Sequence, residues 1–309
     1  MTRKMNRLKY TFLAFGLIVG IQACKQKTVK SIANDDFTSG KATFAVDDSF
    51  APIVGQEMYI FKSRYPDADP TVLYLTENHA VNLLLNDSVR VAILSRELDT
   101  AELNVLKRRS LDVKIVRFAS DAITLIVNKA SNDTLASVGE LKKMLNGHGD
   151  LNKTIVFDNP NSSLVRYLKE LSGNNEFKQK NIYALKSSKE VIKYVSEHPD
   201  ALGITGYSWL VDPDKDYASY VDNVKIVGVK DEANKKYPNE YFKPSQETLV
   251  LKQYPLSRGL YIVDCSSKTG LAMGFASFIA GDVGQRIILR SGLLPDSMPP
   301  REINLRSKL

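Results

Sequence analysis

Residues 158–171, DNPNSSLVRYLKEL, join a run of small polar residues to an amphipathic helix. The apolar residues Leu164, Tyr167, Leu168 and Leu171 recur at helical spacing after the polar run DNPNSS. One N-cap residue is enough to stabilise a helix start, so the run carries more hydrogen-bonding groups than capping requires. Backbone N–H groups and the positive end of the helix dipole favour an anion at such a start. The stretch therefore predicts either a capped helix or one part of an anion site.

The same strand-then-helix arrangement recurs along the chain. The runs KATFAV (41–46), TVLYL (71–75), VRVAIL (89–94) and KTIVF (153–157) are each followed by polar residues and a helical pattern. VRVAIL is nearly all apolar, which is typical of a parallel strand that is buried on both faces. This alternation predicts an α/β fold with parallel sheets. Because ligands of open α/β sheets bind at the carboxyl ends of the strands, we expect site residues at these junctions.

Further apolar runs complete the expected series of elements. The other expected strands are VKIVRF (113–118), AITLIVN (122–128), ALGIT (201–205), VKIVGV (224–229), ETLVL (247–251) and GLYIVD (259–264). The other expected helices include VGELKKMLNG (138–147), SKEVIKYVSEH (188–198) and AMGFASFIAGDVGQRIILRSG (272–292).

The N-terminus has the pattern of a targeting segment. Basic MTRKMNRLKY precedes TFLAFGLIVGI, whose eleven residues fall short of the ~20 that a membrane-spanning helix needs. Residues 1–23 are therefore predicted to be a secretory signal peptide. The sequence Ile-Gln-Ala-Cys at 21–24 resembles the lipobox of bacterial lipoproteins, which implies cleavage before Cys24 and an acylated cysteine. An uncleaved signal anchor or an accidental cysteine is the alternative.

Residues 24–40 are polar and weakly patterned, so we expect them to tether a folded body that begins near Lys41. Two or three acyl chains on Cys24, palmitate among them, would anchor the tether stably where one chain would not. Lys25 follows the cysteine, and by the general sorting pattern of lipoproteins this favours the outer membrane.

Composition excludes several other classes of protein. The 309 residues carry a formal charge of +7, of which residues 1–23 contribute four basic side chains and no acid, leaving +3 for the rest. Those charges are interspersed, so we do not expect nucleic-acid binding. With Cys24 acylated, only Cys265 remains, so no disulfide is expected, and its apolar surroundings predict a buried side chain.

The chain also lacks the common signatures of catalysis. It contains no P-loop and no Gly-x-Ser-x-Gly motif, and its three histidines are far apart without metal-ligand spacing. We therefore expect no enzyme activity, no cofactor and no metal.

Six segments together resemble the phosphate-binding lipoproteins and periplasmic proteins of the high-affinity ABC phosphate transporter. They cover roughly residues 40–296, nearly all of the predicted mature chain. In order, they are DDSFAPIVGQEMYIFKSRYPD (47–67), VAILSRELDTAEL (91–103), SDAITLIVNKASN (120–132), HPDALGITGYSWL (198–210), YPLSRGLYIV (254–263) and AGDVGQRIILRSGLLP (280–295).

This resemblance implies a type II periplasmic binding protein, with two α/β lobes, two crossover strands and a ligand cleft between the lobes. The crossovers are expected near 118–126 and 250–262. Lobe I would then comprise 41–118 and 262–309, and lobe II would comprise 119–261. The resemblance also implies a monomer that binds phosphate or a similar oxyanion and delivers it to ABC permease subunits.

The family's phosphate site is built from backbone N–H groups and hydroxyls at helix starts, often with an arginine. Carried over by motif, the site residues of lobe I are Ser49, Phe50, Thr76, Glu77, Ser95 and Arg96. Glu77 departs from the pattern, because a carboxylate there either repels an anion or accepts the proton of hydrogen phosphate. The alternative for the hydroxyl residues is plain helix capping, for Arg96 it is an ion pair, and for Glu77 it is a solvated acid at a helix start.

The stretch 158–171 corresponds to the family's Ser-Gly-Thr helix start, and it implies Asn161, Ser162, Ser163 and Arg166 as the share of lobe II. Ser162 stands where the family has glycine, and Phe157 stands where an arginine is common. Arg166 could supply that cation, or it could be a surface residue. The departures leave a second hypothesis open, namely an envelope scaffold or sensor lipoprotein that keeps the fold and has lost the anion site.

Overall fold

The computed structural model describes residues 35–149 and 153–297. The predicted signal peptide, Cys24 and most of the predicted tether lie outside the described residues. Within the described part, no helix is both long and apolar enough to cross a membrane.

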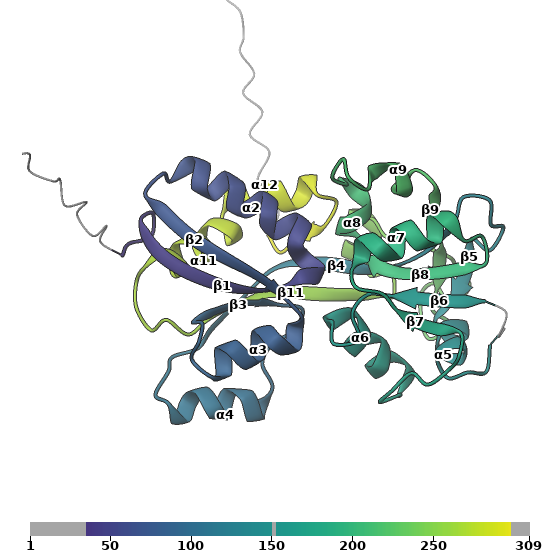
Figure 1. The fold of residues 1–309 in the computed structure, drawn as a ribbon, viewed down its shortest axis with the longest axis horizontal. Coiled ribbons are helices and arrows are strands. Elements are labelled where there is room, and N and C mark those ends of the chain that lie inside the picture. Colours follow the sequence, from purple (N-terminus) through teal and green to yellow (C-terminus); the bar gives the residue numbers. More distant parts are fainter. Residues whose placement is uncertain (1–34, 150–152, 298–309) are drawn as a thin grey trace, which may run out of the picture. The chain divides into compact units, whose positions relative to one another are not determined.

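A sheet that continues from one lobe into the other organises the fold (Figure 1). In lobe I, β1 (Gly40–Asp47) pairs in parallel with β2 (Ala68–Leu75) on one side and β3 (Val91–Leu94) on the other. All four residues of β3 are buried, as its unbroken apolar run predicts. The parallel pairing brings the carboxyl ends of β1, β2 and β3 to one edge of the sheet.

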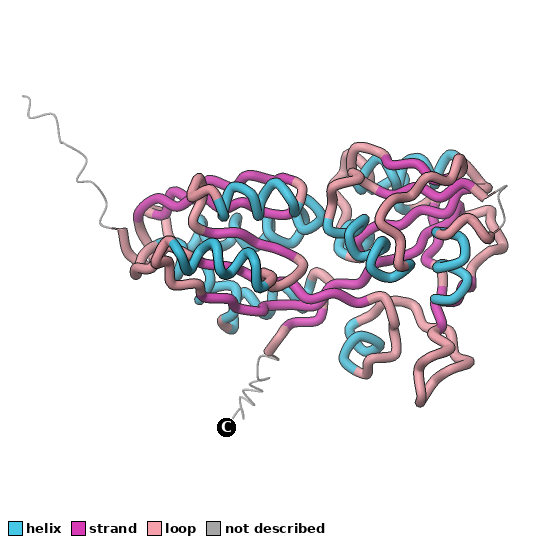
Figure 2. Tube along the Cα trace, turned by 90° about the horizontal axis from the view of Figure 1, so that it is seen from below, coloured by secondary structure: helices cyan, strands magenta, loops and turns pink. Residues whose placement is uncertain are grey.

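Two long antiparallel strands carry the chain between the lobes. They are β4 (Lys114–Asn128) and β11 (Ser257–Asp264), which pair along the whole length of β11 with one register shift at Leu260/Tyr261. Figure 2 shows strand segments that run from one lobe into the other. The two strands predicted at 113–118 and 122–128 are therefore one continuous strand, because the polar residues between them lie inside the crossover.

Lobe II contains the second half of the sheet. Here β8 (Ala201–Gly206) pairs antiparallel with β4 and in parallel with β6 (Thr154–Phe157), and β7 (Ile182–Ala184) lies at the edge. The predicted strand at 224–229 is divided: β9 (Val224–Ile226) pairs with β4, whereas β10 (Gly228–Lys230) pairs with β5 (Leu135–Ser137) in a separate small sheet.

Helices flank the strands in both lobes. Those of lobe I are α2 (Ala51–Arg64), which follows the short 3-10 turn η2 (Asp48–Phe50), α3 (Glu77–Leu85), α4 (Thr100–Arg108), α11 (Leu271–Ala280) and α12 (Asp282–Arg290). Those of lobe II are α5 (Val138–Leu145), α6 (Ser163–Ser172), α7 (Ser188–Glu197), α8 (Ser208–Val211), α9 (Ala218–Val221) and α10 (Gln246–Val250). The short strand β12 (Leu294–Pro295) pairs with β4.

Two further expectations from the sequence were wrong. Residues 247–251 were expected as a strand, but they lie mostly in α10, because Ser245 accepts from the Thr248 N–H and forms a capping box. The single helix expected at 272–292 is two helices that meet at Gly281.

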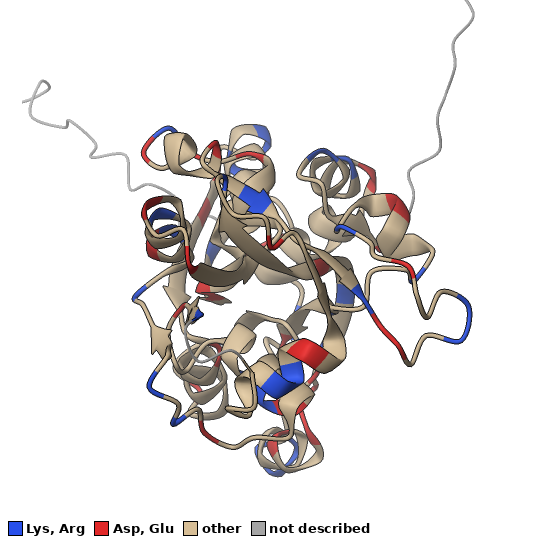
Figure 3. Ribbon diagram, turned by 90° about the vertical axis from the view of Figure 1, so that its right-hand side faces the viewer, with Lys and Arg blue, Asp and Glu red and all other residues tan. Residues whose placement is uncertain are grey.

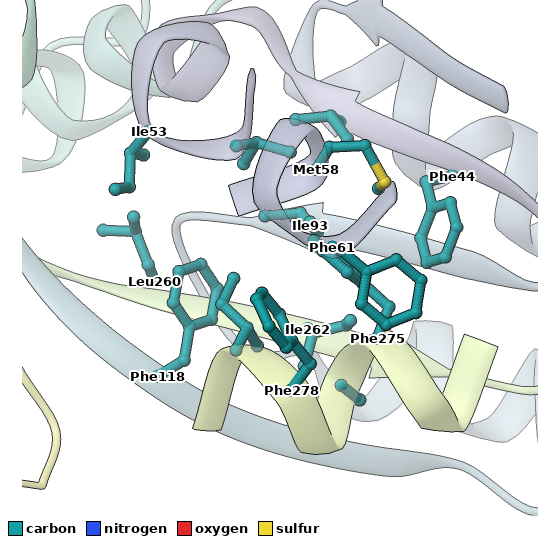
Figure 4. Close-up of a cluster of buried hydrophobic side chains, with 14 of the residues drawn as sticks. Phe44, Ile53, Met58, Phe61, Ile93, Phe118, Leu260, Ile262, Phe275 and Phe278 are labelled. Atoms are coloured by element: carbon teal, nitrogen blue, oxygen red, sulfur yellow. The ribbon is translucent and has the colours of Figure 1, made fainter. Parts of the chain in front are cut away.

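Aromatic packing holds the core of lobe I (Figure 4). The ring of Phe275 lies edge-on to those of Phe44 and Phe61, with centroids 5.2 and 5.3 Å apart, and Phe61 also contacts Phe278. Such pairs contribute about 0.5–1.5 kcal/mol each beyond their burial. Lobe II has apolar clusters of its own around Leu164 and Val191, so each lobe gives its helix starts a fixed support.

Candidate functional site

Two helix starts, one in each lobe, bring their serine side chains together. Ser49 lies in η2 just before α2, and Ser163 is the first residue of α6. Their hydroxyl oxygens are 3.3 Å apart and buried, although the residues are 114 positions apart in sequence. Neither hydroxyl caps its own helix. Asp47 accepts from the Ser49 N–H, and Ser162 accepts from the Val165 N–H.

A buried arginine from a crossover strand completes this group. Arg258 of β11 donates to the Ser163 hydroxyl at 2.8 Å, and its Nε and Nη2 donate to Asp121 Oδ2 at 3.1 and 2.9 Å. Its guanidinium lies 4.6 Å from the ring centroid of Phe50. The sequence reasoning missed both Arg258 and Asp121. The available signal was an arginine within the apolar crossover motif YPLSRGLYIV.

A second group lies at the carboxyl end of β3. Glu77 accepts from the Ser95 N–H at 3.1 Å and from the Ser95 hydroxyl at 2.6 Å. Arg166 of lobe II donates to the other oxygen of Glu77 at 2.6 Å and to the Ser95 hydroxyl at 2.7 Å. Burial opposes ionisation of Glu77, but Arg166 and Ser95 outweigh it and hold the pKa of Glu77 below its ordinary value.

Three further carboxyl groups lie close to the two serines. Burial raises the pKa of Asp47 to about 7, and the charge of Glu77 adds to this rise. Burial likewise raises the pKa of Asp158 to about 7. For Asp48, burial and then the charge of Asp158 raise the pKa to about 6. These carboxyls therefore change protonation near neutral pH, and their charges are coupled to one another.

The remaining predicted site residues take no part in the hydrogen bonds that join Ser49, Ser163 and Arg258. Asn161 is exposed. Thr76 is the N-cap of α3 but makes no side-chain capping bond. The Ser162 hydroxyl donates to Asp158 at 2.5 Å while it caps α6, so it behaves as a structural residue. Arg96 makes a bidentate pair with Glu102, both bonds 2.7 Å long, and its Nε is 3.8 Å from Glu77.

Trp209 of lobe II stabilises the turn that contains Ser49. Trp209 Nε1 donates to the Ser49 carbonyl at 2.9 Å, and the Tyr217 hydroxyl donates to the Trp209 carbonyl at 3.1 Å. Nearby, Gln56 of α2 donates to Asp212 at 3.1 Å, which is another contact between the lobes. These bonds fix the position of the Ser49 turn against lobe II.

The arrangement offers hydroxyl and guanidinium donors beside carboxyl groups that can also accept a proton. Each of the arginines 96, 166 and 258 already has a carboxylate partner. A bound anion would therefore meet carboxyl groups as well as donors, and one that carries its own proton can satisfy both. Elsewhere on the molecule acidic and basic residues are interspersed (Figure 3). Across 35–149 and 153–297, no group of three or more His, Cys, Asp or Glu side chains could hold a metal ion.

Comparisons with known proteins agree with this architecture. The solved structures that resemble the chain include the following three. The first, a candidate phosphate ABC transporter substrate-binding protein of Clostridium perfringens with bound phosphate, has a TM-score of 0.69 and 19% identity over 84% of this chain and 100% of its own. An ABC-type phosphate transport receptor of Vibrio cholerae has a TM-score of 0.62 and 17% identity over 83% and 100%. A candidate phosphate-binding protein of Planctomyces limnophilus has a TM-score of 0.58 and 18% identity over 83% and 93%.

At these identities the likeness establishes the fold, which is the type II architecture of two α/β lobes and two crossover strands. A search of the curated proteins found no match. The family model for a PBP superfamily domain matches residues 31–283, most of the chain. The chain thus belongs to the periplasmic binding protein (PBP) superfamily.

Proposed function

We propose that this protein is the lipid-anchored solute-binding component of an ABC importer, and that it captures phosphate or a related oxyanion between its lobes. One observation carries the proposal: the side chains of Ser49, Ser163 and Arg258 converge from lobe I, lobe II and a crossover strand. A ligand held by all three would tie the lobes together, as hinge closure around a ligand requires.

Phosphate is favoured because the site combines donors with buried carboxyls. Asp47 and Asp158 lie beside the serines and titrate near neutral pH, so either can accept a proton from hydrogen phosphate. Fully ionised sulfate has no such proton to give and would meet repulsion. The phosphate-related names of the three similar structures support the same ligand class.

Calorimetric titration of the full-length protein, purified in detergent, tests the ligand. The panel is phosphate, arsenate, sulfate, molybdate and tungstate. We expect micromolar or tighter binding of phosphate and arsenate, and weaker binding of sulfate. Absence of heat with every oxyanion at micromolar levels would contradict the proposal.

The anchor is tested separately from the ligand. Cys24→Ser removes the predicted acylation site, so the chain should move from the membrane fraction to the soluble fraction and lose incorporation of labelled palmitate. Cys265→Ser is the matched control, because Cys265 is buried and should not affect the anchor. The lobe boundaries at 118/119 and 261/262, monomeric state and outer-membrane location belong to the same proposal.

A second candidate is an envelope scaffold or sensor that keeps the fold without taking up an anion. It is favoured by the pairing of Arg96, Arg166 and Arg258 with carboxylates of the chain itself. Under this hypothesis no oxyanion binds, and neither Ser49→Ala nor Ser163→Ala affects the protein's role in cells. Under the first hypothesis both substitutions impair growth on limiting phosphate.

A further inference from the structure

Glu77 is the carboxylate of the second group described above, at the carboxyl end of β3. Its side chain is 1% exposed, and both of its oxygens accept hydrogen bonds. Oε1 takes the N–H and the hydroxyl of Ser95, and Oε2 takes Nε of Arg166. Arg96 is a second positively charged neighbour: its Nε lies 3.8 Å from Oε2, and the residue is next to Ser95 in sequence.

The partners of Glu77 are the kinds of donor that an oxyanion would use. A backbone N–H and a hydroxyl at the carboxyl end of a buried parallel strand, together with a guanidinium, are the usual elements of an anion site. Glu77 is the first residue of α3, yet its carboxylate reaches Ser95 after β3 and does not cap its own helix. Capping therefore does not account for this geometry.

The same contact joins the two lobes. Arg166 belongs to α6 of lobe II, whereas Glu77 and Ser95 belong to lobe I. Arg166 bonds both of them, at 2.6 Å to Glu77 and 2.7 Å to Ser95. Because the carboxylate is buried and the arginine half-buried, the pair is screened far less than a surface salt bridge.

We infer that the Glu77 carboxylate is an internal substitute for the ligand, which holds the lobes together through Arg166 and must be displaced from Ser95 and Arg166 by an incoming oxyanion. The displacement step rests on the proposed function, whereas the bridge between the lobes does not. Glu77 thereby competes with the anion for these donors and lowers the affinity of the site for it. It also makes the closed arrangement of the lobes possible without a bound anion.

A matched pair of substitutions separates this role from a general loss of charge. Glu77→Gln removes the carboxylate charge and keeps the shape of the side chain. Arg166 keeps Glu170 as a partner at 2.8 Å, and Arg96 keeps Glu102, so neither arginine is left without a carboxylate and the variant should fold. Glu170→Gln is the control. It removes a carboxylate from the same arginine, but Glu170 lies on α6 itself and does not link the lobes.

The first measurement is the distance between the lobes in full-length protein purified without phosphate. Nitroxide labels on cysteines introduced by Lys62→Cys in α2 and Lys193→Cys in α7, both exposed helix positions, report it by pulsed electron paramagnetic resonance. We expect one short distance in the parent and in Glu170→Gln, and a longer or broader distribution in Glu77→Gln. An unchanged distribution in Glu77→Gln would overturn the bridge, whether or not any oxyanion binds.

The second measurement is calorimetric titration with inorganic phosphate. Glu77→Gln removes the buried carboxylate charge that competes with phosphate for Ser95 and Arg166. The phosphate affinity of this variant should therefore rise by about tenfold or more. Glu170→Gln should leave it unchanged. Weaker binding by Glu77→Gln would overturn displacement and would instead make Glu77 a contact of the ligand, and equal binding would overturn it too. If the parent and both variants bind no oxyanion, the proposed function and the displacement step both fail, and the distance measurement still decides the bridge.

Discussion

The hydroxyl oxygens of Ser49 and Ser163 lie 3.3 Å apart across the junction of the two lobes. Each hydroxyl stands at a helix start, and neither is used as a cap. Capping by Asp47 and Ser162 therefore leaves both serine hydroxyls directed toward each other, with Arg258 donating to one of them. This relationship is the geometric basis of the predictions that follow.

Ser163→Ala should weaken phosphate binding by roughly 10- to 100-fold, because it removes one hydrogen bond to a charged ligand, about 1.5–3 kcal/mol. It also removes the acceptor of Arg258. The measurement is calorimetric titration. Ser172→Ala is the control, because Ser172 lies at the other end of α6 and its hydroxyl donates only to backbone carbonyls there. Equal effects of the two substitutions would argue against a ligand contact at Ser163.

Phosphate affinity should fall as the pH rises from 6 to 8. Asp47 and Asp158 both have pKa values of about 7, so both become ionised over this interval; one carboxylate can accept the proton of hydrogen phosphate, and the second then repels the anion. Each carboxyl that must stay protonated can reduce affinity by up to about tenfold per pH unit above its pKa.

Phosphate itself also titrates, but this titration is the same in experiments with the parent and with Asp158→Asn. A comparison of the two proteins therefore isolates the contribution of the protein. The pH dependence of the variant should be less steep than that of the parent, with similar affinity at pH 6. Parallel profiles for parent and variant would show that Asp158 does not titrate in the site.

Glu57→Gln should stabilise the protein, and more so at pH 8 than at pH 5. Glu57 of α2 is fully buried, neither carboxyl oxygen has a hydrogen-bond partner, and burial raises its pKa to about 9. Between its ordinary pKa and about 9 the unfolded chain releases this proton while the folded chain keeps it, so stability is lost as the pH rises.

The expected gain at pH 8 is roughly 1–3 kcal/mol in the free energy of unfolding, measured by denaturant titration at both pH values. Glu97→Gln, at an exposed position, is the control and should change stability little. A gain that is the same at pH 5 and pH 8 would contradict a neutral carboxyl at Glu57.

Trp209→Phe should lower stability by about 1–3 kcal/mol, because it leaves the buried Ser49 carbonyl without its 2.9 Å donor. Trp209 is the single tryptophan of the chain, so its fluorescence also reports the lobe junction. In the parent protein, we expect the fluorescence of Trp209 to change with phosphate concentration until it saturates. Tyr217→Phe, which removes the bond to the Trp209 carbonyl but keeps the indole donor, should keep the signal.

Much of the fold was predictable because its strands are local patterns. The runs at 41–46, 71–75 and 89–94 are apolar and end in helix-start residues, and the structure has a strand at each. The prediction of a strand at 247–251 was wrong for a local reason as well. Three apolar residues in five suit either a strand or a helix, and the capping box at Ser245 favours the helix.

The site was less predictable because its decisive pair is not local. Arg258 and Asp121 are 137 positions apart and meet only because the crossover strands are antiparallel neighbours. For Glu77, the sequence left repulsion, proton acceptance and a solvated helix-start acid open, and the structure shows a buried carboxylate that is already hydrogen-bonded to Ser95 and Arg166. Neither contact can be derived from spacing, because the first depends on the pairing of the two crossover strands and the second on how the lobes meet.

The most direct test of the central claim is a crystal structure of the protein grown with arsenate, whose anomalous scattering locates the anion without ambiguity. Arsenate replaces phosphate as a tetrahedral oxyanion that carries a proton. The account predicts one anomalous peak at the lobe junction, with oxygens at about 2.6–3.2 Å from Ser49, Ser163 and Arg258. No peak there, or a peak at another place with Ser49 and Ser163 still in contact, would contradict it.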